Sequence, residues 1–83
     1  MSGLVILDVR TPEEYASGHI PGARNITHDQ LAGRLAELAD DRDQDLLVYC
    51  RSGRRAASAI ETLRAAGYTS LSHLDGDMLG WQA

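Results

Sequence analysis

The residues best suited to chemistry lie together in one short segment, VYCRSGRR at positions 48–55. Cys50 is the single cysteine of the chain, and the residues that follow it are Arg51, Ser52, Gly53, Arg54 and Arg55. A cysteine reacts as its thiolate, a form that neighbouring positive charge and a helix N-terminus favour. A lone cysteine is more often a small buried apolar side chain, but that role does not require three arginines beside it. We therefore interpret the segment as a nucleophilic thiolate in an anion-binding loop.

The elements predicted on either side place this loop where parallel α/β sheets bind their ligands. Residues 46–49, LLVY, form a short apolar run typical of a buried strand, and Cys50 follows them directly. After the loop, a helix that begins near Arg54 is predicted from an apolar face made of Ala56, Ala57, Ile60 and Leu63. Backbone N–H groups and the helix dipole at such a junction attract an anion, and Gly53 permits a tight backbone path.

The length of the loop distinguishes between two kinds of anion. Protein tyrosine phosphatases enclose a phosphate with a cysteine, five further residues and an arginine. Here four residues separate Cys50 from Arg55, and Ala56 stands where the phosphatase arginine would be. The shorter loop makes a smaller cradle, which fits one sulfur atom better than a tetrahedral phosphate. A phosphatase or an arsenate reductase is therefore disfavoured.

Three more strands are predicted along the chain. Residues 4–8, LVILD, form a continuous apolar run that favours a strand covered on both faces. Residues 70–74, SLSHL, alternate between polar and apolar side chains, which is typical of an edge strand. A very short strand is predicted at 24–26, RNI.

Helices are predicted between these strands. Capping-box patterns begin at Thr11, ahead of a short helix that Gly18 can end, and at Thr27, ahead of a stripe of Leu31, Leu35 and Leu38. A final turn or helix is predicted around 77–81. This alternation indicates an α/β fold, a mainly parallel sheet of about four strands with helices on both faces, and residues 1–83 are expected to form one domain.

The composition excludes several classes of protein. The net charge of −4 argues against a nucleic-acid partner, and all eight basic residues are arginine. One cysteine cannot form an intramolecular disulfide, and the spacing of His19, His28 and His73 is not that of a metal site. No apolar run is long enough for a membrane span, and the N-terminus lacks the charged start of a signal peptide. We expect a cytoplasmic protein, or a periplasmic one if a signal peptide has been removed.

Three motifs occur in order along nearly the whole chain: LDVRTPEEYASGHIPGARNI at 7–26, VYCRSGRRA at 48–56 and LDGDMLGW at 74–81. On these motifs the chain resembles the rhodanese family of sulfurtransferases, in its small single-domain type. The positions of the first motif that carry the resemblance are Asp8, Arg10, Glu14, Gly18, His19, Ile20, Pro21, Gly22 and Ala23.

The resemblance implies a thiosulfate sulfurtransferase that needs no cofactor. Cys50 would take the sulfane sulfur of thiosulfate or a similar donor, release sulfite, and pass the sulfur from a persulfide to cyanide or a thiol. Arg55 is expected to bind the donor's anionic group, with Arg51 and Arg54 as outer steering charges, while Ser52 and Gly53 complete the loop. The alternative is a carrier module that receives persulfide sulfur from a partner protein in a relay. Mercaptopyruvate is a less expected donor, because a loop that accepts it would be expected to contain fewer arginines.

Other residues of the resemblance are expected to support the site. Asp8 and Arg10 would fix the loop after their strand, and His19 would orient the GHIPG turn at 18–22 by hydrogen bonds. The last motif is expected to pack into the core through Met78, Leu79 and Trp81.

The chain departs from the family pattern at two places. Family members usually have a strand and a helix before the LDVR region, whereas this chain begins almost at that strand, so the family's first strand is expected to be missing and 70–74 to be left as an edge. Asp77 stands where the family usually has a second glycine. Aspartate tolerates a positive φ better than most residues, and a carboxylate near the active rim would weaken the binding of anionic donors.

Overall fold

A computed structural model describes residues 3–38, 42–74 and 76–80 of the chain. Within them, four parallel strands form one sheet in the order β2-β1-β3-β4. The bounds are Val5–Asp8 for β1, Arg24–Asn25 for β2, Leu46–Tyr49 for β3 and Leu71–His73 for β4. The mainly parallel sheet of about four strands is confirmed, including the two-residue strand β2 and the edge position of β4.

The two central strands carry the apolar runs of the sequence. β1 and β3 pair in register from Val5 opposite Leu46 to Asp8 opposite Tyr49. Both strands end at the same edge of the sheet, as parallel strands must, so the residues that follow Asp8 and Tyr49 are brought to one rim.

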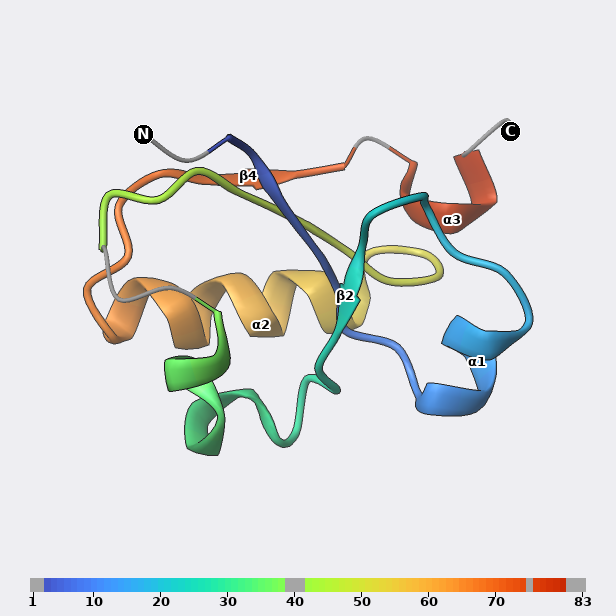
Figure 1. The fold of residues 1–83 in the computed structure, drawn as a ribbon, viewed down its shortest axis with the longest axis horizontal. Helices are drawn as coiled ribbons and strands as arrows, with labels where there is room; N and C mark the ends of the chain where they lie inside the picture. Colours follow the sequence, from blue (N-terminus) through green and yellow to red (C-terminus); the bar gives the residue numbers. More distant parts are fainter. Residues whose placement is uncertain (1–2, 39–41, 75, 81–83) are drawn as a thin grey trace.

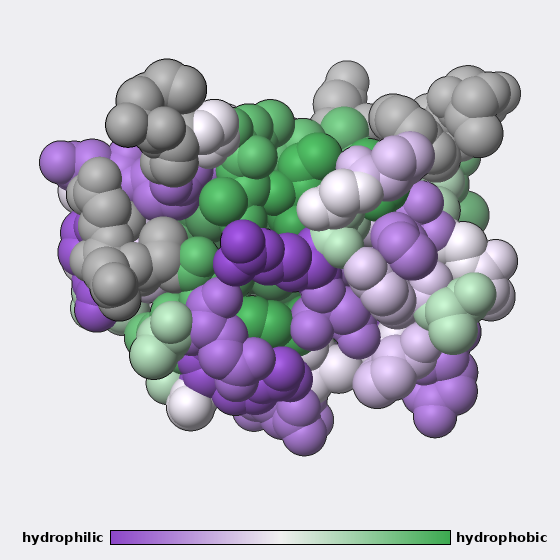
Figure 2. Space-filling view, viewed as in Figure 1, coloured by the Kyte–Doolittle hydropathy of each residue, from purple (hydrophilic) through white to green (hydrophobic). Residues whose placement is uncertain are grey.

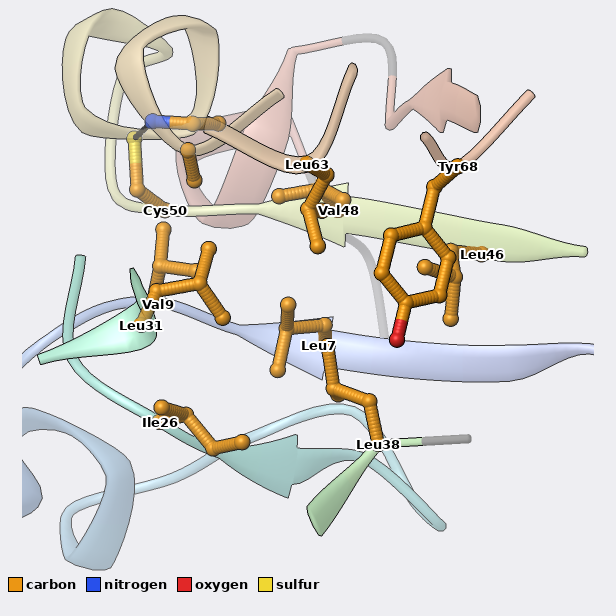
Figure 3. Packing of buried hydrophobic residues seen from close by; sticks show 12 residues of the cluster. Leu7, Val9, Ile26, Leu31, Leu38, Leu46, Val48, Cys50, Leu63 and Tyr68 are labelled. Atoms are coloured by element: carbon orange, nitrogen blue, oxygen red, sulfur yellow. Dashed lines mark hydrogen bonds between the residues drawn. The ribbon is translucent and has the colours of Figure 1, made fainter. Parts of the chain in front are cut away.

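Helix α2, Arg54–Ala65, covers one face of the sheet. Its apolar stripe packs with side chains of β1, β3 and the segments around them in a single buried cluster, most of which Figure 3 labels: Leu7, Val9, Ile26, Leu31, Leu38, Leu46, Val48, Cys50, Ala56, Ala59, Leu63 and Tyr68. The cluster spans the face from Tyr68 at one end to Cys50 at the other (Figure 3). The side chain of Cys50 is therefore held in place by its contacts with the core.

The other face carries two short helices, α1 at Pro12–Ala16 and α3 at Asp77–Gly80. Tyr15 of α1 and Met78 of α3 pack with Ile20, Ala23 and Tyr49 in a second, smaller cluster. Helices on both faces are thus confirmed, and the loop after β3 lies on the same side of the molecule as α1 and α3 (Figure 1). Figure 2 shows apolar surface in the middle of this view, bordered by hydrophilic side chains.

The helix predicted through Leu31, Leu35 and Leu38 is wrong. Two 3-10 turns replace it, η1 at Leu31–Gly33 and η2 at Leu35–Glu37, separated by Arg34 at φ −124° and ψ 20°. Leu31 and Leu38 are nevertheless buried in the main cluster. Their burial, rather than a helical period, explains the leucine pattern, and Gly33 within the stripe disfavours a continuous helix.

The last motif was expected to pack into the core through three side chains, and their outcomes differ. Met78 packs into the second cluster as expected, whereas Leu79 is 65% exposed, so its predicted core role is wrong. Helix α3 has a single turn, and only one of two successive residues on such a turn can face the sheet. Trp81 lies outside the described residues.

Within the described ranges, no helix is both long and apolar enough to cross a membrane.

Candidate active site

Cys50 directly follows β3 at the carboxyl edge of the sheet, and the loop that it opens runs into α2. Gly53 is the N-cap residue of α2 and has a φ of 113°, in the left-handed region that L side chains rarely adopt. A β-carbon on Gly53 would also lie 3.0 Å from Oδ2 of Asp77. Backbone conformation and packing therefore both call for glycine at the turn of the loop.

The sulfur of Cys50 lies within the loop and accepts hydrogen bonds from the backbone. The N–H of Gly53 donates to Sγ at 3.0 Å, and the N–H of Ala56, in the first turn of α2, donates at 3.3 Å. Both donors stabilise negative charge on the sulfur, which a buried apolar role would not require. Cys50 is fully buried, whereas the next two residues of the loop, Arg51 and Ser52, are exposed.

Arg55 is already paired with a carboxylate. Its Nη1 and Nη2 donate to Oε1 and Oε2 of Glu14 at 2.7 and 3.0 Å, across 41 positions of sequence. This hydrogen bond lowers the pKa of Glu14 to about 2 and raises the pKa of Arg55. Glu14 also completes the predicted capping box with Thr11, so the pair ties the start of α2 to the start of α1. Arg51 and Arg54 are exposed at the mouth of the loop.

Replacing Glu14 with glutamine should reduce stability near neutral pH and have little effect near pH 2. Because the folded pKa of about 2 lies below the ordinary 4.5, the ionised form stabilises the fold above about pH 4.5, and this contribution disappears as the pH falls toward 2. The pair is partly exposed, so we expect about 1 kcal/mol, or about 5 °C in Tm, at pH 7. Thermal melts of both proteins from pH 7 to pH 2 measure the difference.

The exposed pair of Glu37 with Arg34 offers a matched control. Glu37→Gln should leave Tm nearly unchanged at pH 7. A difference between wild type and Glu14→Gln that persisted undiminished down to pH 2 would contradict the electrostatic origin of the effect.

Asp8 and Arg10 form a buried ion pair at the same rim. The guanidinium donates to both carboxylate oxygens of Asp8, with the shortest contact 2.7 Å from Nη2 to Oδ2, and the Arg10 backbone N–H donates to Oδ1 at 2.8 Å. Nη2 also donates to the carbonyl of Gly18 at 2.7 Å. The pair therefore holds the segment after α1 against the end of β1.

His19 lies further from the loop, on the surface. Its ring stacks on Tyr15 with centroids 3.7 Å apart, and Nδ1 lies 2.8 Å from the Tyr15 carbonyl oxygen. The next residue is held by Tyr49, whose hydroxyl accepts the N–H of Ile20 at 3.2 Å. Burial raises the pKa of Tyr49 to about 12, so this hydroxyl stays neutral. These contacts shape the turn without involving the sulfur.

Two residues at the site were not among the predicted site residues. Asp77 is almost fully buried, and its Oδ1 accepts the backbone N–H of Cys50 at 2.9 Å. The Nε2 atom of His73, at the end of β4, lies 2.9 Å from both carboxylate oxygens of Asp77. The positive φ expected of Asp77 is confirmed at 53°. The departure from the motif at Asp77 was the one signal in the sequence that pointed to this pair.

Helix α3 also holds the backbone of the loop. The N–H groups of Met78 and Leu79 donate to the carbonyls of Cys50 and Arg51 at 3.0 and 3.1 Å. Together with Asp77, three successive residues of α3 thus fix the first two residues of the loop. Among the described residues, no group of three or more histidine, cysteine or acidic side chains is arranged to hold a metal ion.

Comparisons with known proteins identify the family and the fold. A family model described as a rhodanese-like domain matches residues 1–83. The chain is 46% identical over 81 residues to the HTH-type transcriptional regulator Rv0324 of Mycobacterium tuberculosis, covering 95% of this chain and 34% of the relative. It is 37% identical over 70 residues to the thiosulfate sulfurtransferase PspE of Escherichia coli, covering 84% of this chain and 67% of the relative. The chain thus spans about a third of the first relative.

A solved structure shares the fold. The structure titled "rhodanese with anions from E. coli" superposes with a TM-score of 0.82 at 35% identity, covering 87% of this chain and 85% of that one. The resemblance and the fold expected from the three motifs are both confirmed.

Proposed function

The chain belongs to the rhodanese-like domain family, and on that premise we propose that it moves a sulfane sulfur from an anionic donor such as thiosulfate to cyanide or a thiol, through a persulfide on Cys50. The observation that carries the proposal is the position of Sγ, which accepts two backbone N–H groups inside a short loop at the carboxyl edge of the sheet. Relatives named thiosulfate sulfurtransferase support the same activity.

The first half of the reaction forms the persulfide. The Cys50 thiolate attacks the outer sulfur of thiosulfate, a new S–S bond forms, and the bond within thiosulfate breaks so that sulfite leaves with the electron pair. The negative charge ends on the outer sulfur of the persulfide. The N–H groups that now point at Sγ, from Gly53 and Ala56, are placed to stabilise the charge as it develops.

The second half returns the enzyme to its thiolate. Cyanide or a thiolate attacks the outer sulfur and leaves with it, as thiocyanate or as a new persulfide, and the electron pair of the broken S–S bond returns to Cys50. No external oxidant or reductant is needed in either half.

The arginines divide into two roles in this proposal. Arg51 and Arg54 are exposed at the loop and attract the anionic donor. Arg55 retains a share in donor binding through its charge, but its guanidinium is held by Glu14, so its first role is to fix the loop. Ser52 and Gly53 shape the exposed turn, while Asp8, Arg10 and His19 support the surrounding segments.

The second candidate is a sulfur carrier that receives persulfide from a partner protein. One observation favours it: the same domain covers only 34% of a longer relative named a transcriptional regulator, so the family is found as a module joined to other segments. Burial of Cys50 does not separate the two candidates, because a sulfur donor must reach Sγ in both. For residues 1–83 themselves, we propose one domain that carries the complete site.

A steady-state assay separates these functions. With thiosulfate and cyanide, we expect thiocyanate and sulfite to appear in equal amounts, and we expect no hydrolysis of p-nitrophenyl phosphate. Hydrolysis of the phosphate ester without thiocyanate would overturn the proposal in favour of a phosphatase. Thiocyanate that appears only when a persulfide-carrying partner protein replaces thiosulfate would favour the carrier.

A further inference from the structure

Behind the cysteine loop lies a carboxylate that the proposed reaction does not use. Asp77 is 2% exposed, and the described contacts of its carboxylate are the backbone N–H of Cys50 and the imidazole of His73. Its backbone is held at φ 53°, making it the single non-glycine position with a positive φ in the part of the chain that the structure describes. A buried carboxylate costs free energy even when it is hydrogen-bonded, so its place beside the nucleophile calls for an explanation.

The carboxylate is close enough to act on the reacting sulfur. Its Oδ1 lies 2.9 Å from the backbone nitrogen of Cys50, and within one cysteine that nitrogen and Sγ are about 4 Å apart at most, so Oδ1 lies within about 7 Å of Sγ. Its Oδ2 lies 3.0 Å from the position that a β-carbon on Gly53 would occupy. Asp77 thus faces the loop from Cys50 to Gly53.

The negative charge of Asp77 acts against the attraction that the loop arginines exert on anions. The Asp77 carboxylate places negative charge beside the loop, and it already accepts the N–H of Cys50, which is then unavailable to a donor anion. The arginines at the mouth attract any anion, whereas Asp77 repels an anion in proportion to its charge once it nears the sulfur. The loop therefore combines attraction at long range with discrimination at short range.

We propose that Asp77, held in place by His73, is a specificity-determining residue that disfavours doubly charged sulfur donors relative to singly charged ones. The inference rests on the proposed function and narrows its substrate class to monoanionic sulfane donors, such as persulfides and thiosulfonates. Thiosulfate remains a donor, but a slowed one. His73 positions the carboxylate by contacting both of its oxygens.

The size of the effect follows from the distance. The charge by which a dianionic donor exceeds a monoanionic one lies beyond the sulfur, so about 7–10 Å separates it from Asp77. Over that distance the dielectric constant of water gives about a two- to threefold change in rate constant, and a less polar site gives more. Removing the charge should therefore raise the ratio of kcat/KM for a dianionic donor to that for a monoanionic donor by at least about twofold at low ionic strength.

The first test compares thiosulfate with methanethiosulfonate, which transfers the same outer sulfur but carries one charge fewer. Asp77→Asn keeps an oxygen that can accept the Cys50 N–H and removes the charge. At pH 8.5 and low salt, we expect the thiosulfate-to-methanethiosulfonate ratio of kcat/KM to rise by at least about twofold. A merely structural role would lower both values together and leave the ratio unchanged, which would overturn the proposal.

Two further variants serve as controls, one for backbone strain at position 77 and one for the net charge of the protein. Asp77→Gly removes the same charge and relieves the positive φ, so it should shift the ratio in the same direction. Asp45→Asn changes the net charge identically at the opposite end of β3, about 16 Å from Cys50 along the strand, and should change the ratio by less than about 1.5-fold. An equal shift in Asp45→Asn would overturn the proposal, because it would trace the effect to net charge alone.

A second measurement does not depend on sulfur transfer. Iodoacetate and iodoacetamide alkylate a thiolate by the same displacement of iodide, but they differ by one negative charge. The ratio of the iodoacetate rate to the iodoacetamide rate at Cys50 should likewise rise by about twofold or more in Asp77→Asn. An unchanged alkylation ratio overturns the inference, whatever the donor assay gives.

The two failures are distinguishable. If the wild-type protein accepts sulfur from neither donor, the proposed function has failed and the donor preference falls with it. If the wild type transfers sulfur from both donors and the ratios do not move in Asp77→Asn and Asp77→Gly, the proposed function stands and the inference alone is overturned.

Discussion

Replacing Cys50 with serine is expected to lower transfer of sulfur from thiosulfate to cyanide by at least about 1000-fold. A serine hydroxyl stays protonated at neutral pH, and it cannot form a persulfide. The substitution is nearly isosteric, and the new oxygen can accept the same N–H groups of Gly53 and Ala56 that now point at Sγ. The fold should therefore survive, and thiocyanate production measured beside a thermal melt would separate lost chemistry from lost structure.

The control for this loss is another small change nearby. Ser58→Ala alters an exposed residue of α2 outside the loop and should keep activity within about twofold of wild type. Activity of Cys50→Ser within tenfold of wild type, in a protein with an unchanged melt, would remove Cys50 from the mechanism.

Replacing Asp8 with asparagine should destabilise the domain by about 3–5 kcal/mol, because it leaves the Arg10 guanidinium buried without its counter-charge. A domain of this size has a total stability of only about 5–10 kcal/mol, so the variant should be partly unfolded at 37 °C. The carbonyl of Gly18 and the ring of Tyr49 remain near Arg10, but neither neutralises its charge. Urea unfolding followed by circular dichroism measures the loss.

The double variant identifies the cause. Asp8→Asn combined with Arg10→Met removes both charges and should be less destabilised than the sum of the two single variants. Arg34→Met, which breaks the exposed pair with Glu37, should leave the urea midpoint nearly unchanged. Additive losses in the double variant would show that the two side chains act independently, contrary to the contacts between them.

The sequence predicted the strand before Cys50 and the helix after it correctly because their signals are local. A β-branched and aromatic run, one cysteine, a glycine and a helical stripe follow each other within 20 positions, and each element forms under the influence of its neighbours. The capping box at Thr11 and the positive φ at Asp77 were predictable for the same reason. Parallel pairing then brings Asp8 and Tyr49 to one rim.

The contacts that modify the loop were not predictable in this way. Glu14 and Arg55 each belong to a recognisable motif, but they meet across 41 positions only because α1 and α2 start at the same rim. The link between Asp77 and Cys50 likewise spans 27 positions and depends on where α3 crosses the sheet edge. A local sequence pattern gives no information about contacts between residues this far apart in the chain. The partner of Arg55 and the contacts of Asp77 were therefore found only in the structure.

The leucines at 31, 35 and 38 led instead to a wrong prediction from a local pattern. Their spacing fits a helix, but apolar residues recur wherever a segment must cover a core, and Gly33 and Arg34 allow short 3-10 turns to do so. Spacing alone does not distinguish between these structures when the segment is short.

The central claim, a sulfur-accepting thiolate at Cys50, is tested most directly by the intact mass of the wild-type protein after incubation with thiosulfate. We predict a gain of about 32 Da, one sulfur atom, located at Cys50 and removed by cyanide. An unchanged mass, with no release of sulfite into the solution, would contradict the account.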